Sequence, residues 1–258
     1  MKKKELVVKS NRLIEASYRL SMNEQRIILY AICRCREEQK GLFPDEPVVI
    51  PAEAFMKQFP GVGLGNVYQL LKEAMDTLYE RSVTLYETDE ATGLPQVSKT
   101  RWISKASYVD GGGCIKLVFT PDVIKHITRL WPEHTSYLLE QVGNMTSGHA
   151  VHMYELLAQF KGIGTRTLTL AWLREALQIE PGEYKLTADF KKWVIDAAVT
   201  QIKKHSDLDV NYTPVKTGRA ITGFAFTIEG KDAKPKAPAP KKPQADLLAV
   251  HADADEAF

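Results

Sequence analysis

The same order of predicted helices and strands occurs twice along this chain of 258 residues, and this repetition constrains the fold more than any single motif. In the first half, apolar residues at helical spacing predict a first helix, which Ser21 and Glu24 begin with the spacing of a capping box. Prolines and glycines separate the elements that follow. The predicted ranges are a helix at 21–39, a strand at 48–50, a helix at 51–59, a turn at 60–65, a helix at 66–79 and strands at 82–87, 101–109 and 115–120.

The second half repeats that order after a helix opened by Pro121 and a connecting stretch at 135–147. The predicted ranges are a helix at 150–160, a strand at 167–170, a helix at 171–179, a turn at 181–182, a helix at 186–205 and a hairpin of strands at 208–212 and 221–228. Two copies of a helix-turn-helix followed by a hairpin predict an α+β fold with two tandem winged-helix domains, at residues 1–134 and 135–230. This architecture favours DNA binding, although protein-binding winged helices share it.

The helix at 186–205 has the pattern of a DNA recognition helix. Apolar residues recur on one side from Phe190 to Ile202, so that side must pack on a core. The other side is polar and partly basic, and Thr187 can cap the N-terminus through its hydroxyl. We expect this side to enter a DNA major groove, whereas the alternative is an ordinary amphipathic surface helix with solvated lysines. The predicted DNA-binding residues here are Lys185, Thr187, Lys191, Lys192, Asp196, Thr200 and Lys203.

Two further sets of DNA-binding residues are predicted outside this helix. Lys216 and Arg219 lie at the tip of the second hairpin, where we expect them to touch phosphates or the minor groove. Asn66, Gln69 and Lys72 lie on the corresponding helix of the first domain. We expect these three to make secondary contacts that matter less.

Composition narrows the class of protein. The formal net charge of +2 is too small to demonstrate a nucleic-acid partner, so the DNA argument depends on local patches. The three cysteines lack Cys-x-x-Cys spacing, which argues against a disulfide framework and against a zinc site. No run approaches the roughly 20 apolar residues of a membrane span, and no apolar core of a secretion signal follows the N-terminal lysines. We therefore expect a cytoplasmic protein with no membrane partner.

Four segments together resemble the iteron-binding plasmid replication initiators. They are residues 11–30, 152–157, 189–195 and 223–228, which read NRLIEASYRLSMNEQRIILY, HMYELL, DFKKWVI and GFAFTI. The resemblance implies a protein that binds double-stranded DNA at directly repeated iterons as a monomer, helps open the origin and recruits host replication proteins. It also implies repression of the protein's own promoter by a dimer. By the same resemblance, the second domain makes the main base-specific contacts and the first domain supplies the dimer interface.

One residue departs from that family's pattern. Trp193 stands where relatives often carry an arginine, on the outer side of the helix beside Lys192 and Ala197. Its ring can either pack on the neighbouring hairpin or contact a thymine methyl group or a sugar on DNA. The sequence leaves both roles open.

Catalysis is not expected. A nicking initiator would need a nucleophilic tyrosine near two metal-binding histidines separated by one residue, whereas His149 and His152 are three apart. They are interpreted as satisfied or exposed histidines, with no metal and no cofactor. No Gly-x-x-x-x-Gly-Lys-Ser/Thr occurs, which disfavours a P-loop ATPase. The remaining alternative to a replication initiator is a winged-helix transcriptional repressor or partitioning protein.

The C-terminal segment at 231–258 is predicted to be a disordered tail. A Pro/Ala/Lys run up to Pro243 cannot form a core and suits an extended linker. The residues that follow it, Gln244, Ala245, Asp246, Leu247 and Leu248, resemble the short peptide by which bacterial proteins bind the replicative sliding clamp. A glutamine amide and a leucine pair would suit an apolar pocket on such a partner. The alternative is a solubilising tail without a partner.

Overall fold

Two winged-helix domains are built from two three-stranded sheets of matching topology. The computed structural model describes residues 5–59, 67–89, 91–109, 111–128 and 132–231. In each domain the short strand after the first helix pairs with the last strand, which also pairs with the strand before it, giving the orders β2-β6-β5 and β8-β10-β9. The predicted fold class is therefore confirmed. Most of the segment predicted as a tail lies outside the described residues.

The first half of the chain contains more elements than the predicted repeat. Its helices and strands are β1 (Leu6–Ser10), α1 (Asn11–Glu15), α2 (Met22–Glu38), β2 (Val48–Pro51), α3 (Ala52–Gln58), α4 (Val67–Glu80), β3 (Ser82–Thr88), β4 (Pro95–Arg101), β5 (Ile103–Val109), β6 (Cys114–Phe119) and α5 (Pro121–Ile127). The capping box that begins α2 is present, since the Ser21 side chain accepts from Glu24 N and Glu24 accepts from Ser21 N.

The second half follows the prediction closely after residue 147. Its elements are β7 (His134–Leu138), α6 (Glu140–Gly143), α7 (Gly148–Ala158), β8 (Thr165–Thr169), α8 (Leu170–Ala176), α9 (Thr187–Phe190), a π-helical turn η1 (Lys191–Asp196), α10 (Ala197–His205), β9 (Leu208–Thr217) and β10 (Ala220–Gly230). The connecting stretch predicted at 135–147 was wrong, because it contains β7 and α6. The domain boundary at residues 134 and 135 stays a prediction.

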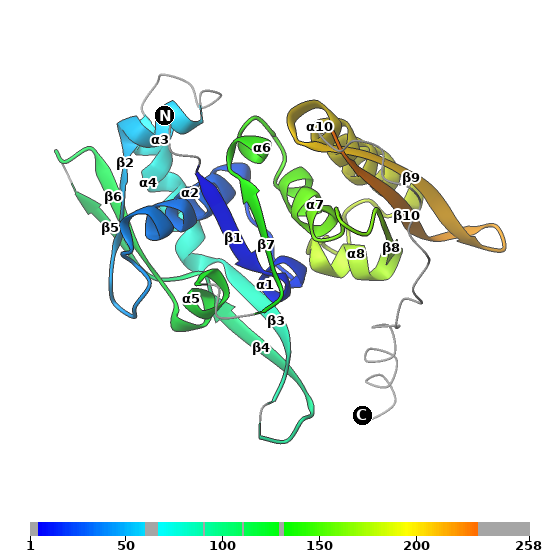
Figure 1. The fold of residues 1–258 in the computed structure, drawn as a ribbon, viewed down its shortest axis with the longest axis horizontal. Helices are drawn as coiled ribbons and strands as arrows, with labels where there is room; N and C mark the ends of the chain where they lie inside the picture. Colours follow the sequence, from blue (N-terminus) through cyan, green and yellow to red (C-terminus); the bar gives the residue numbers. More distant parts are fainter. Residues whose placement is uncertain (1–4, 60–66, 90, 110, 129–131, 232–258) are drawn as a thin grey trace.

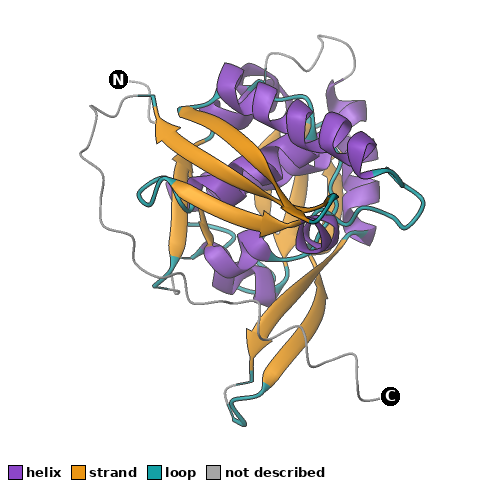
Figure 2. Ribbon diagram, turned by 90° about the vertical axis from the view of Figure 1, so that its right-hand side faces the viewer, coloured by secondary structure: helices purple, strands orange, loops and turns teal. Residues whose placement is uncertain are grey.

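The strand predicted at 101–109 corresponds to β5, which begins at Ile103, whereas Arg101 ends β4, a strand of a different sheet that was not predicted. Trp102 is fully buried between them, and its backbone N–H donates to the carbonyl of Arg81 at 3.4 Å. On one side of Trp102, β4 pairs only with β3, and on the other side β5 pairs with β6. The β3–β4 hairpin extends away from the body of the molecule at the bottom of both ribbon views (Figure 1 and Figure 2). Burial of Trp102 thus fixes the point at which the chain changes sheets.

The segment before α2 links the two halves of the chain. β1 pairs with β7 in an antiparallel ladder between segments far apart in the sequence. Ser17 Oγ donates to the carbonyl of Glu175 at 2.5 Å, and Tyr18 N donates to the carbonyl of Ala176 at 3.3 Å. Residues 5–18 therefore pack between the first domain and α8 of the second, and β1 and β7 lie at the centre of the molecule in Figure 1.

A buried polar cluster lies at this junction. Lys9 Nζ is 2.7 Å from Oε1 and 3.0 Å from Oε2 of Glu155, and neither side chain is more than 1% exposed. Glu155 also accepts from the hydroxyls of Tyr18, at 3.1 Å, and Tyr137, at 2.5 Å. Because one carboxylate serves three donors from three segments, the cluster fixes β1, β7 and α7 relative to one another.

No helix in the described part of the chain is long and apolar enough to cross a membrane.

Candidate nucleic-acid interface

The helix predicted at 186–205 is one continuous helical segment made of α9, η1 and α10. Its apolar side is buried and packs on α7 and on β9, with the Phe190 ring 6.5 Å from that of Phe224 on β10. The predicted cap by Thr187 was wrong, because the helix begins after Leu186 without any side-chain cap, and Thr187 is the first helical residue. Tertiary packing of the apolar side, rather than a cap, therefore holds this helix in place.

The π-helical turn changes the role of two predicted DNA-binding residues. In this turn Lys191 Nζ lies 3.0 Å from Oδ2 of Asp196, five residues further on. The Tyr212 hydroxyl, from β9, also donates to Asp196, and the Lys191 ammonium lies 5.5 Å from the centre of the Tyr212 ring. Hydrogen bonding to Tyr212 and Asp196 raises the pKa of Lys191. Asp196 therefore holds Lys191 and joins the helix to the hairpin, which leaves little of its charge for a base edge.

A second contact joins the same helix to β9 about two turns later. Lys203 Nζ donates to Oδ1 of Asn211 at 2.7 Å and lies 3.5 Å from Oδ1 of Asp209. Thr200 Oγ1 donates back to the carbonyl of Asp196 at 2.8 Å and is exposed. On the other flank, Gln201 accepts from Thr146 N at 2.7 Å. Both flanks of the helix are thus fixed to neighbouring segments.

The exposed strip between these flanks carries the remaining cations. Lys185, Lys192 and Lys204 are exposed, and none of the three makes an ion pair with a described residue. Lys204 was not predicted, although its place in the last helical turn was visible in the sequence. Lys192 Nζ lies 4.5 Å from the centre of the Trp193 ring, which is 57% exposed. The ring is therefore largely in solvent and not buried against the hairpin.

The second hairpin has a rigid base and an exposed tip. The Tyr212 ring lies 5.5 Å from Phe224 and 5.8 Å from Phe226, and both phenylalanines are buried. Residues 213–220 are exposed throughout, and Gly218, with φ of 60°, makes the turn. Lys216 and Arg219 flank that turn and have no acidic partner within the described residues. The hairpin lies beside α10 and projects from the edge of the molecule (Figure 1).

Two family models match the chain in the order of its two domains. The model described as "Initiator Replication protein, WH1" matches residues 6–158, and the model described as "Initiator Rep protein, WH2" matches residues 169–228. The first match alone covers more than half of the chain. This chain belongs to the initiator replication protein family. The resemblance found in the sequence is therefore confirmed, and the chain is a DNA-binding replication initiator by family.

Relatives of this initiator protein extend over most of its length. An "Uncharacterized 27.6 kDa protein" from Escherichia coli is 24% identical over 237 residues, which are 90% of this chain and 97% of the relative. The structure of the Pi initiator protein in complex with iteron DNA matches with a TM-score of 0.72 at 20% identity and covers 90% of this chain and 100% of that chain. At this identity the match shows the fold. The WH1 domain of MSBI1.176, a replication protein isolated from a multiple sclerosis patient, is 35% identical, covers 43% of this chain and 82% of that domain, and has a TM-score of 0.37.

The corresponding helix of the first domain, α4, presents a different surface in this initiator. Gln69 Nε2 donates to Glu73 at 2.9 Å, and Lys72 Nζ lies 5.2 Å from the centre of the Tyr108 ring. The exposed residues of α4 include the acids Glu73, Asp76 and Glu80. Carboxylates repel DNA phosphates, so this face is less suited to DNA than that of α10. The contacts predicted for Gln69 and Lys72 stay predictions, and Asn66 lies outside the described residues.

His152 of the initiator occupies a structural position. His152 is fully buried, stacks on Tyr18 at 4.2 Å and hydrogen-bonds the carbonyl of Ile14 through Nε2 at 2.7 Å, as the interpretation of a satisfied histidine required. Burial lowers the pKa of His152 to about 4. No group of three or more His, Cys, Asp or Glu suited to a metal occurs among the residues that the structure describes.

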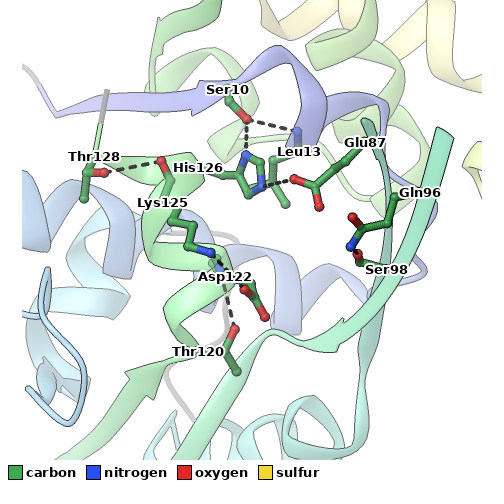
Figure 3. Close-up of polar contacts among 11 residues, drawn as sticks. Ser10, Leu13, Glu87, Gln96, Ser98, Thr120, Asp122, Lys125, His126 and Thr128 are labelled. Carbon is green, nitrogen blue, oxygen red and sulfur yellow. Dashed lines mark hydrogen bonds and ion pairs between the residues drawn. The ribbon is translucent and has the colours of Figure 1, made fainter. Parts of the chain in front are cut away.

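A row of serine, histidine and glutamate near α5 also has a structural explanation (Figure 3). Ser10 Oγ lies 2.8 Å from Nδ1 of His126, whose Nε2 lies 3.7 Å from Oε1 of Glu87. Ser10 Oγ also accepts from Leu13 N at 3.1 Å, so it caps α1, and both Ser10 and His126 are 2% exposed. A buried hydroxyl that serves as a helix cap is out of reach of a substrate. The row therefore joins β1, α5 and the β3–β4 hairpin.

Proposed function

We propose that this protein initiates replication of the DNA that carries it by binding directly repeated iterons at the origin. The proposal rests on the family models together with the position of the cations. Both initiator family models match the chain in order, and the α9–α10 helix and the adjacent hairpin of the second domain expose cations without an acidic partner among the described residues. The Pi initiator protein, which has the same fold, was captured with iteron DNA. Cations at a helix N-terminus and at a hairpin tip suit a major groove and the flanking phosphates.

The residues divide into two roles in this proposal. Lys192 and Lys185 contact base edges or phosphates, while Lys216 and Arg219 contact phosphates or the minor groove. Lys191 is held by Asp196 and Tyr212, so these residues orient the helix against the hairpin. Replacing Lys191 and Lys192 together by alanine should weaken binding by about 1–3 kcal/mol for each base-specific contact. Because Lys191 is already paired, we expect Lys192→Ala to account for most of that loss.

Origin opening, recruitment of host replication proteins and repression of the protein's own promoter by a dimer belong to the same proposal. The protein then acts in the cytoplasm without catalysis and without a cofactor. A footprint on the DNA flanking its own gene, combined with permanganate probing of A·T-rich DNA, tests repeat binding and origin opening together. Direct repeats with an opened segment support an initiator. An inverted repeat alone, with no opening, would instead indicate a repressor or a partitioning protein.

Monomer and dimer are alternative states of the chain in this proposal, because dimerisation and full iteron contact compete for the first domain. Sedimentation of the complex on a single repeat measures its stoichiometry. We expect one chain on each repeat. A stable dimer on every single repeat would contradict the competition.

The C-terminal peptide at 244–248, which lies outside the described residues, is proposed to bind the sliding clamp. A Pro/Lys linker would let a DNA-bound initiator reach that partner. Changing Leu247 and Leu248 to alanine should leave repeat binding intact and abolish capture of the purified clamp. If the unmodified chain shows no clamp binding at micromolar concentration, the tail is a solubilising segment.

A further inference from the structure

Trp193 is the one large aromatic side chain of the α9–α10 helix that faces solvent in the described structure. The other aromatic residue of that helix, Phe190, is fully buried, whereas the Trp193 side chain is 57% exposed. Leaving an indole in water forgoes one of the largest gains of apolar burial open to a side chain. The exposure fits a surface that is covered when a partner binds.

The surroundings of Trp193 show which partner fits. One flank of the helix is fixed to β9 through Asp196 and Lys203, and the other is fixed to the segment before α7 through Gln201. Trp193 and Lys192 lie on the exposed side of the helix together with Lys204, and the carboxylate one turn before Trp193 is the half-buried Asp189, which makes no ion pair among the described residues. A rigid, basic strip with one apolar ring matches the major groove, where anionic phosphates border base edges and the thymine methyl groups.

Resting on the proposed function, we propose that Trp193 is a specificity-determining residue that contacts the C5 methyl group of a thymine in the major groove. The Lys192 ammonium, 4.5 Å from the ring centre, covers one face of the indole. The second face and the ring edge are left for an apolar contact. The same lysine is placed to contact the edge or the phosphate of a neighbouring base. Asp196 and Lys191 position the helix and do not read a base.

Uracil substitution isolates this methyl contact. The probe is the duplex that the full chain recovers from a pool of random sequences, made again with deoxyuridine in place of each thymine in turn. Removing the contacted methyl should weaken binding of the unmodified protein about fourfold at one or two positions, the effect of one buried methyl group. Trp193→Ala should bind the thymine and uracil forms of that position equally, and Trp193→Phe should retain part of the difference. Trp172→Phe, on α8, is the matched control and should keep the full difference.

The outcomes separate this inference from the proposed function. If Trp193→Ala keeps the same uracil profile as the unmodified chain, another residue contacts the methyl group and the inference is overturned. The same holds if Trp193→Ala weakens only single-stranded DNA binding, because the ring would then stack on unpaired bases. If the full chain recovers no duplex at all, DNA recognition itself fails and the inference fails with it.

Discussion

Replacing Lys9 by methionine tests whether the buried cluster at the junction holds the two halves together. Methionine keeps the length and the apolar stem but removes the charge, so Glu155 is left as a buried carboxylate with only the two tyrosine hydroxyls as donors. Removing one partner of a buried ion pair costs about 3–5 kcal/mol. Because two hydrogen bonds to the carboxylate remain, we expect about 3 kcal/mol, the lower end of that range.

Urea unfolding at pH 7, followed by circular dichroism, measures this loss. With a slope of roughly 2–3 kcal/mol per molar urea, the midpoint should fall by about 1 M. Lys57→Met is the matched control, because Lys57 is 70% exposed and pairs with Glu53 on the surface of α3. That variant should change the free energy of unfolding by less than about 0.5 kcal/mol.

A double variant completes this test. Lys9→Met combined with Glu155→Gln removes both buried charges, so it should recover part of the stability lost in Lys9→Met. If Lys9→Met unfolds at the midpoint of the unmodified protein, the cluster does not stabilise the junction and the reasoning is refuted.

Three further predictions concern the hairpin, a buried histidine and a close backbone approach. Replacing Lys216 and Arg219 by alanine should weaken binding to all DNA sequences similarly and lower the slope of log affinity against log salt by about one unit per phosphate contact. A changed base preference at constant slope would argue against phosphate contacts by these two residues. The pKa of His152 is about 4 in the folded protein and about 6.5 in the unfolded chain, so the unfolded state binds more protons between these two values. The free energy of unfolding should therefore fall by up to about 3 kcal/mol as the pH drops from about 6.5 to about 4, and His152→Gln should lose this pH dependence. A Cβ at Gly223 would lie 2.6 Å from a backbone oxygen of β8, so Gly223→Ala should cost about 1–3 kcal/mol, while Gly182→Ala, with open space around it, should unfold like the unmodified protein.

Local sequence signals predicted the helices well. The Ser21 and Glu24 capping box and the apolar spacing after it are properties of adjacent residues, so they located α2 to within one residue at its start. The same holds for the apolar side of α9–α10. The pairing of β1 with β7 was missed because each strand has only five residues and β7 lies in the second half of the chain, far from β1 in the sequence.

The candidate site was predicted as a set of residues but not as a set of contacts. Lys191, Asp196 and Lys203 were all placed on the DNA-facing side, yet each is tied to β9. Tyr212, the partner of Asp196, and Asn211, the partner of Lys203, lie in the next strand. Residue spacing in the sequence does not show which side chains of a strand contact a neighbouring helix. The sequence could therefore identify the helix, and the structure was needed to separate the residues that orient it from those exposed to a partner.

Equilibrium binding to directly repeated DNA tests the central claim most directly. The measurement compares the full chain and its Lys192→Ala variant on a duplex carrying direct repeats from the DNA flanking the gene and on a scrambled duplex of equal length and composition, at one salt concentration. We predict that the unmodified chain prefers the repeats and that Lys192→Ala binds them roughly 5- to 150-fold more weakly, the effect of losing one base-specific contact of about 1–3 kcal/mol. Equal affinity of the unmodified chain for both duplexes, or an unchanged affinity of Lys192→Ala for the repeats, would contradict the assignment of this helix as the DNA-reading element.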